Sequence, residues 1–89
     1  MVYIVTYDLN KPFKAYDSLY SSLKAYSYAK DPGLDSVWFI ETQLTPEQIF
    51  NSLAGSIDKN DRVFISRIRL DENYGWLSPE VWNWLEPRI

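Results

Sequence analysis

The first ten residues, Met1 to Asn10, constrain the fold more than any other part of the chain. They read MVYIVTYDLN, and six of the seven residues from Val2 to Asp8 are β-branched or aromatic. Such a run followed by polar and turn-forming residues is typical of a buried strand that ends at a loop. We therefore expect a central strand that ends at the carboxylate of Asp8. Alternation along this strand places Val2, Ile4, Thr6 and Asp8 on one face and Tyr3, Val5 and Tyr7 on the other.

Asp8 has two interpretations that its spacing alone does not separate. A carboxylate at the end of a central strand is the first place in this chain to look for chemistry. An Asp after a strand also commonly caps the following turn or helix, because its side chain accepts hydrogen bonds from nearby backbone N–H groups.

The length and composition predict one small domain that meets a partner. The 89 residues provide a single core, and we treat 1–89 as one domain with a core over 1–70 and a Trp-rich segment over 71–89. Aromatic residues make up 17% of the chain: four Trp, seven Tyr and four Phe. One core of this size cannot easily bury so many rings, so we expect a homodimer.

The charge and the missing residue types exclude several classes of function. The net charge of −3 argues against a generally basic surface for nucleic acid and leaves only a local contact. The chain has no Cys and no His, which excludes disulfides, zinc clusters and histidine-based triads. Because no apolar run is long enough to span a bilayer and Asp8 comes too early for a signal peptide, we expect a cytoplasmic protein without a membrane partner.

Local patterns predict the remaining elements. A helix is expected from about Pro12 to about Ala25, with an apolar stripe formed by Phe13, Tyr16, Leu19, Tyr20, Leu23 and Tyr26. A hairpin follows, with a weak strand over 26–30, a turn at Asp31-Pro32-Gly33 and a clear strand over 36–42. That second strand is apolar on both faces, so each face needs cover.

The second helix has the clearest local signature. Thr45 is placed as its N-cap, Pro46 as its first residue, and Gln48 completes a capping box, while Leu44 and Ile49 form a hydrophobic staple. Its expected buried face consists of Ile49, Phe50, Leu53 and Ile57. The carboxylates that follow it are expected to be structural.

A last strand over 61–70 completes a ferredoxin-like α+β pattern. The order βαββαβ predicts a four-stranded antiparallel sheet with two helices on one face, and we place the first and last strands at its centre. Alternation aligns Arg67 and Arg69 on one face of the last strand, where they are candidates for nucleic-acid contact. A short C-terminal helix is expected after Ser78 and Pro79. The face without helices is left to a partner or to solvent.

The four Trp residues are candidates for that interface. Trp38 lies in the third expected strand, and Trp76, Trp82 and Trp84 lie in or before the C-terminal helix. Packing over the sheet or across a dimer is favoured over base stacking, because stacking platforms normally come with flanking basic residues and only Arg88 is near.

Several motifs carry a resemblance to a known family. Tyr7-Asp8, Ser36-Val37-Trp38-Phe39, Leu44-Thr45 and Asp61-Arg62-Val63-Phe64-Ile65 resemble the small CRISPR-associated adaptation protein, a ferredoxin-like dimer. The opening TYDLNKP, the DSVWFI strand, the KNDR turn and the segment GWLSPEVWNWL resemble its SinR-like relatives more closely, and the chain is also similar to VapD-type toxins. The adaptation proteins typically continue into a fifth strand, where this chain has its Trp-rich tail.

The resemblance implies a magnesium site shared between two subunits. In the nuclease members of the family, the aspartate that ends the first strand, here Asp8, meets its symmetry mate and holds Mg²⁺, which activates water for phosphodiester cleavage. Tyr7 and Asn10 would shape this site, and Lys11 would contact phosphate.

Three functions stay open at this point. The first is a dimeric metal-dependent nuclease that uses Asp8. The second is a non-catalytic nucleic-acid or adaptor module that uses Arg67, Arg69 and exposed aromatic residues. The third is a protein-interaction module, such as a phage or mobile-element factor, and the acidic charge balance favours it over the second.

Overall fold

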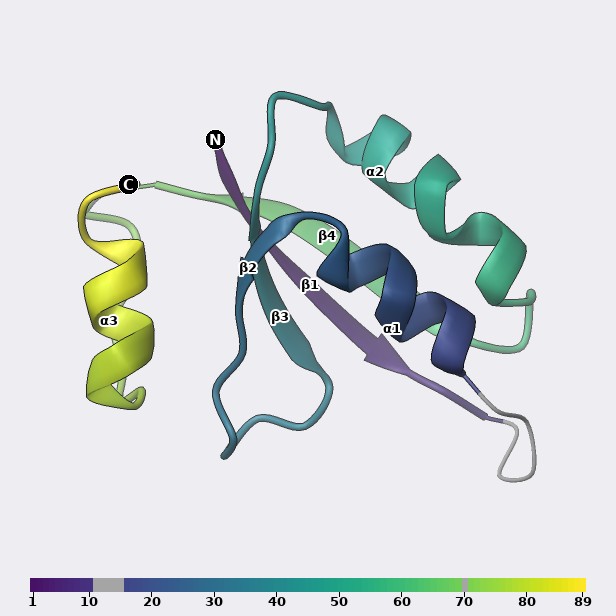
Figure 1. Cartoon of the computed structure of the whole chain (residues 1–89), viewed down its shortest axis with the longest axis horizontal. Coiled ribbons are helices and arrows are strands. Elements are labelled where there is room, and N and C mark those ends of the chain that lie inside the picture. Colours follow the sequence, from purple (N-terminus) through teal and green to yellow (C-terminus); the bar gives the residue numbers. More distant parts are fainter. Residues whose placement is uncertain (11–15, 70) are drawn as a thin grey trace.

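The computed structural model describes residues 1–10, 16–69 and 71–89. It contains four strands, three α-helices and one 3₁₀ turn, shown in Figure 1. In chain order these are β1 (Val2–Asp8), α1 (Asp17–Lys24), β2 (Ser27–Ala29), β3 (Val37–Glu41), α2 (Pro46–Leu53), the 3₁₀ turn η1 (Ala54–Ser56), β4 (Arg62–Ile68) and α3 (Pro79–Leu85). Within the described ranges, none of the helices combines the length and apolar character needed to cross a membrane.

The strands form one antiparallel sheet in the order β2-β3-β1-β4, which confirms the α+β class and the four-stranded sheet. The prediction that the last strand is central is wrong, because β4 lies at an edge and β3 is the second central strand. Burial explains the difference. Trp38, Phe39 and Ile40 in β3 are buried in succession, whereas every residue of β4 is half-buried or exposed. A strand that is apolar on both faces gains more from a central position than one that carries Arg and Ser.

Helices α1 and α2 pack on the same face of the sheet. Leu19 and Leu23 of α1 and Ile49 and Leu53 of α2 are fully buried against it. Their partners in this core are Tyr3, Val5, Trp38 and Ile40, with Tyr16 at its margin. The expected placement of two helices on one face is therefore confirmed.

Helix α3 lies apart from α1 and α2 and covers part of the other face (Figure 1). Val81 and Leu85 of α3 form a second core with Val2 and Phe39 of the sheet. This helix supplies the cover that β3 needs on its second face. The expectation that this whole face is left to a partner or to solvent is therefore wrong, because α3 covers part of it.

The start of α1 differs from the prediction, whereas its end does not. The helix begins at Asp17, because Tyr16 has a non-helical conformation with φ −99° and ψ 26° and caps the helix without a side-chain hydrogen bond. The expected start at Pro12 and the residues Phe13 and Lys14 lie outside the described residues. The expected end is confirmed, since Ala25 is the C-cap.

The predicted start of α2 is confirmed. The hydroxyl of Thr45 accepts the backbone N–H of Gln48 at 3.2 Å, and the side chain of Gln48 accepts the backbone N–H of Thr45 at 2.9 Å. The predicted buried face is only partly right. Phe50 is 43% exposed, because it lies about 100° around the helix from Ile49. Ile57 is half-buried and follows the helix, which ends at Leu53.

Asp61 connects three segments at the end of β1. Its carboxylate is buried and accepts the backbone N–H of Asn10 at 3.0 Å, the hydroxyl of Tyr16 at 2.9 Å and the backbone N–H of Asp58 at 3.0 Å. These bonds hold together the exit of β1, the start of α1 and the turn before β4. The expectation of a structural carboxylate after α2 agrees with this arrangement.

Asp31 has the same role at the start of α3. Its buried carboxylate accepts the backbone N–H of Ser78 at 2.6 Å and that of Gly33 at 2.8 Å. The hydrogen bond from Ser78, followed by that from Gly33, holds the pKa of Asp31 below its usual value. The ionised side chain therefore fixes the β2–β3 turn to the N-terminal end of α3.

Candidate functional site

Asp8 is exposed at the end of β1, on the face that carries no α1 or α2. In the register of the sheet it lies opposite Arg62, and Thr6 lies opposite Phe64. Opposite residues of antiparallel strands share a face, so these four side chains form one surface. We call Thr6, Asp8, Arg62 and Phe64 the open face. A hollow of about 440 Å³ lies there and is also lined by Tyr7 and Val63.

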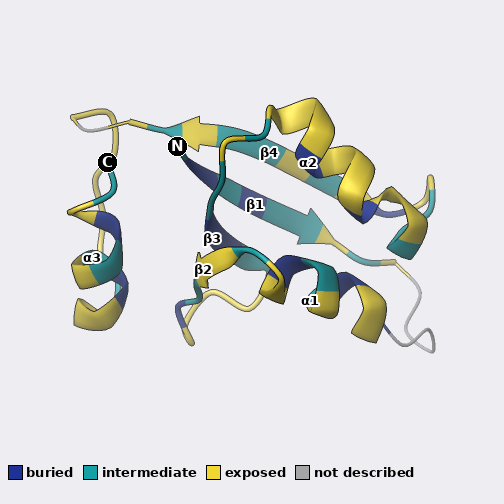
Figure 2. Cartoon of the chain, turned by 45° about the horizontal axis from the view of Figure 1, so that its top comes forward, coloured by how far each residue is buried: buried dark blue, intermediate teal, exposed yellow. Residues whose placement is uncertain are grey.

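The open face is apolar at its centre and charged at its end. Phe64 is 65% exposed, which is unusual for a large aromatic residue in the middle of a strand. Asp8 and Arg62 are both exposed. The guanidinium of Arg62 donates to the backbone carbonyls of Lys59 and Asp61 at 3.3 and 3.4 Å. Figure 2 shows the exposed stretches along β4.

The other residues expected around Asp8 lie in different environments. The side-chain amide of Asn10 donates to the carbonyl of Asn60, and its backbone N–H donates to Asp61. Asn10 therefore fastens the end of β1 to the turn before β4. Tyr7 points to the α1 side, where its hydroxyl accepts the indole N–H of Trp38 at 3.0 Å. Lys11, the candidate phosphate contact, lies outside the described residues.

Arg67 and Arg69 are both exposed, but they are not equivalent. Arg67 lies in β4 opposite Tyr3, which places it on the α1 and α2 side of the sheet. Arg69 follows the end of β4, and its backbone carbonyl accepts from Asn73 and Glu72. The structure therefore places Arg67 on the opposite face from Asp8.

The four Trp residues separate into core and surface positions. Trp38 is 4% exposed and belongs to the core under α1 and α2, so little of it is left for a partner. Trp82 and Trp84 are half-buried around α3. Trp76 is fully exposed in the segment before α3, and so is Tyr74.

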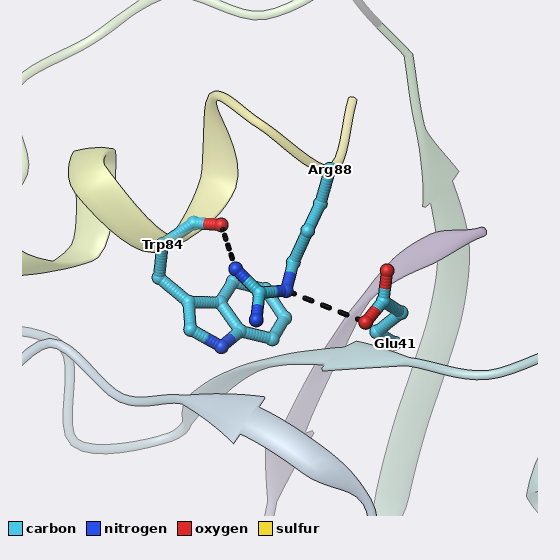
Figure 3. Close-up of polar contacts among 3 residues, drawn as sticks. All are labelled: Glu41, Trp84 and Arg88. Atoms are coloured by element: carbon cyan, nitrogen blue, oxygen red, sulfur yellow. Dashed lines mark hydrogen bonds and ion pairs between the residues drawn. The ribbon is translucent and has the colours of Figure 1, made fainter.

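Trp84 contacts Arg88 at the C-terminal end of the chain. The guanidinium of Arg88 lies 4.4 Å from the centroid of its ring and donates to its backbone carbonyl at 2.8 Å. The same guanidinium pairs with Glu41 of β3 at 3.3 Å, as Figure 3 shows. This contact fixes α3 to the sheet.

Sequence patterns did not indicate an apolar cleft of about 350 Å³ beside α3. The sheet contributes Ile4, Val37, Phe39 and Ile68, the preceding segment contributes Tyr74, Trp76 and Leu77, and α3 contributes Trp82 and Leu85. These residues come from distant parts of the chain. The available signal was the apolar character of both faces of β3 together with the concentration of aromatic residues after residue 71.

The carboxylate of Asp8 is the candidate ligand for magnesium. Among the residues that the structure describes, no group of three or more His, Cys, Asp or Glu side chains is placed to hold a metal ion. Asp8 would supply a single carboxylate, whereas Mg²⁺ requires octahedral oxygen ligation. Magnesium at Asp8 would therefore need further oxygen ligands, from water, substrate phosphates or a second copy of the chain.

No protein-family model, curated protein or solved structure matches the chain. The resemblance to the CRISPR-associated adaptation protein and to its SinR-like relatives therefore depends on the sequence motifs alone.

Proposed function

We propose that the chain is a protein-interaction module that forms a homodimer through its open face. The observation that carries this proposal is the exposure of Phe64 at the centre of the face, on an edge strand and next to Thr6. Burying an aromatic side chain of this size contributes about 1.5–3 kcal/mol. A second copy of the chain would cover Phe64 and remove its apolar surface from water.

Charge complementarity supports a two-fold arrangement. In a two-fold dimer the same surface meets itself, so a residue of one copy can meet a different residue of the other. Asp8 and Arg62 carry opposite charges at one end of the open face. Asp8 of one copy can therefore face Arg62 of the second copy, and two such pairs would form across the axis. The apolar cleft beside α3 and the exposed ring of Trp76 extend the apolar surface on this side of the molecule.

We also propose a ferredoxin-like fold. Counted from the other edge, the strand order is β4-β1-β3-β2, with α1 after β1 and α2 after β3 on the same face. This arrangement supports a split βαβ fold. In such a fold the helix-free face is the natural place for an interface, and here α3 occupies part of it.

The dimer is tested by comparing two exposed phenylalanines. Phe64→Ser is expected to weaken self-association at least tenfold in sedimentation equilibrium, because it removes the centre of the interface. Phe50→Ser is the matched control, since Phe50 is also exposed but lies on α2. It should leave self-association unchanged. A wild-type chain that stays at its monomer mass of 10.5 kDa at micromolar concentration, or an equal loss in both variants, would contradict the proposal.

A metal-dependent nuclease is the second candidate, and the position of Asp8 favours it. Because Asp8 is exposed on the open face, a dimer formed there would bring two Asp8 carboxylates into one interface. Two carboxylates with substrate phosphates and water could bind Mg²⁺, as the family resemblance implies. Arg62 on the same face is a cation that could contact phosphate.

This second candidate predicts that Asp8→Asn abolishes cleavage. The amide keeps the shape of the side chain but loses the charge that binds a cation. The purified wild type should then cleave single-stranded RNA or DNA slowly with Mg²⁺ or Mn²⁺, and EDTA should stop the reaction. Asp17→Asn, which changes an exposed aspartate on α1 away from the open face, should retain full activity. Cleavage that survives Asp8→Asn, or no cleavage by the wild type with either metal, would leave the interaction module as the function.

A further inference from the structure

A second hollow lies on the opposite side of the sheet from the open face, near the end of β1. It has a volume of about 370 Å³. Tyr7 of β1, Tyr20 of α1, Tyr28 of β2 and Trp38 of β3 line it. We call this site the aromatic hollow. Four elements of the fold therefore bring four aromatic side chains to one place.

The four rings form two pairs. Tyr7 and Tyr20 have ring centroids 6.5 Å apart, and Tyr28 and Trp38 have centroids 5.1 Å apart. The hydrogen bond from the indole N–H of Trp38 to the hydroxyl of Tyr7 connects one pair to the other. Tyr28 is 38% exposed, so part of its ring is available to a planar ligand. The site is preorganised, because Trp38 is held in the core.

Two amines lie among these rings. Lys24 is exposed in the last turn of α1, and Lys30 follows β2. The ammonium of Lys30 lies 5.9 Å from the centroid of the Trp38 ring and donates to the carbonyl of Leu34. With Asp35, the described residues that line the hollow carry two positive charges and one negative charge. The hollow is therefore locally cationic on a chain with a net charge of −3.

The hydroxyl of Tyr7 adds a hydrogen-bond donor. Burial raises the pKa of Tyr7 above its usual value, so its hydroxyl stays protonated at neutral pH. Its oxygen accepts the indole N–H of Trp38. The hydrogen of the same hydroxyl can therefore be donated to a ligand.

We propose that the aromatic hollow binds a nucleotide unit, with the base against the exposed part of the Tyr28 ring and the phosphate between Lys24 and Lys30. Aromatic rings next to cationic side chains form the usual platform for a base and its phosphate, because every base has a π-face and every phosphate is anionic. A purely apolar ligand would make no use of the positive charges of Lys24 and Lys30. The unit could come from a free mononucleotide or from a single-stranded nucleic acid. Tyr7 lines both hollows, but the rings and amines of this site lie on the other face of the sheet from the proposed dimer contact.

Titrations of the full-length chain test the proposal, with AMP, adenosine and short single strands of RNA and DNA as probes. Changes in the NMR signals of residues around Tyr28 and Trp38 report binding. We expect AMP to bind more tightly than adenosine, because adenosine lacks the phosphate. Binding of AMP without binding of the single strands would identify a free nucleotide as the source, and stronger binding of the strands would identify nucleic acid.

Matched variants test whether the binding occurs in the hollow. Tyr28→Ser should weaken binding roughly tenfold through the lost stacking. Lys24→Gln should weaken it several-fold and reduce its salt dependence. Tyr74→Ser and Lys59→Gln change exposed residues outside the hollow and should have no effect. Because Lys24 is exposed, Lys24→Gln keeps the fold and remains informative if Tyr28→Ser does not fold. Failure of all four probes to bind, or equal losses in the control variants, would overturn the proposal.

Discussion

Replacing Leu53 by Ala is expected to lower the free energy of unfolding by about 2–5 kcal/mol. Leu53 is fully buried at the end of α2, in the core formed with α1 and the sheet. The substitution removes buried methyl groups and leaves a cavity that a small core can refill only in part. Urea denaturation followed by far-UV circular dichroism measures the change.

Phe50→Ala is the matched control on the same helix. Phe50 is 43% exposed, so its truncation should cost much less than that of Leu53. Ile57→Ala should be intermediate, because Ile57 is half-buried and follows the helix. An unchanged urea midpoint for Leu53→Ala, or a larger effect at Phe50 than at Leu53, would show that the buried face of α2 is assigned wrongly.

Replacing Asp61 by Ala is expected to destabilise the fold by about 3 kcal/mol, an unusually large effect for a polar residue in a turn. The variant leaves the backbone N–H groups of Asn10 and Asp58 and the hydroxyl of Tyr16 without their carboxylate acceptor. Buried donors that lose their acceptor pay the full cost of their desolvation. Thermal and urea denaturation measure the change.

Two comparisons separate the hydrogen bonds of Asp61 from a general effect of losing a carboxylate. Tyr16→Phe removes one of the three bonds and should cost about 1 kcal/mol. Glu72→Ala removes an exposed carboxylate and should change stability by less than about 0.5 kcal/mol. If Asp61→Ala unfolds at the same urea concentration as Glu72→Ala, Asp61 does not connect the three segments energetically.

The elements that could be predicted are those with short-range signals. The β-branched and aromatic run of β1, the capping box of Thr45 and Gln48, and Pro79 at the start of α3 each have a local physical cause, and all three are present. These signals act over a few residues. The expected order of helices and strands followed from them, and so did the four-stranded sheet.

Features that depend on long-range contacts could not be predicted in the same way. The edge position of β4 depends on how the burial of β3 compares with that of β4. The contact between Asp31 and Ser78 joins residues that are 47 positions apart, and no local pattern marks it. Helix α3 packs on Val2 and Phe39, so the face opposite α1 and α2 is partly covered. This contact also joins distant parts of the chain.

The candidate site was predicted in part for the same reason. Alternation along β1 correctly separated Asp8 from Tyr7, and the strand ends at Asp8 as expected. Its neighbours Arg62 and Phe64 are set by the register with β4, which a single sequence does not provide. Asn10 was expected to shape the site, but it is engaged by Asp61 and Asn60.

Paramagnetic broadening between two copies of the chain tests the proposed dimer most directly. The chain has no cysteine, so Lys59→Cys provides a unique position for a nitroxide label in the exposed turn beside Arg62, at the margin of the open face and outside the proposed contact. The labelled variant is mixed with ¹⁵N-labelled wild type, and the amide signals of the wild type are recorded. We predict broadening at Thr6 and Phe64 of the ¹⁵N-labelled copy, with Ser18 on α1 unaffected. Absence of broadening at micromolar to millimolar concentrations, or broadening confined to α1 and α2, would contradict a dimer formed through the open face.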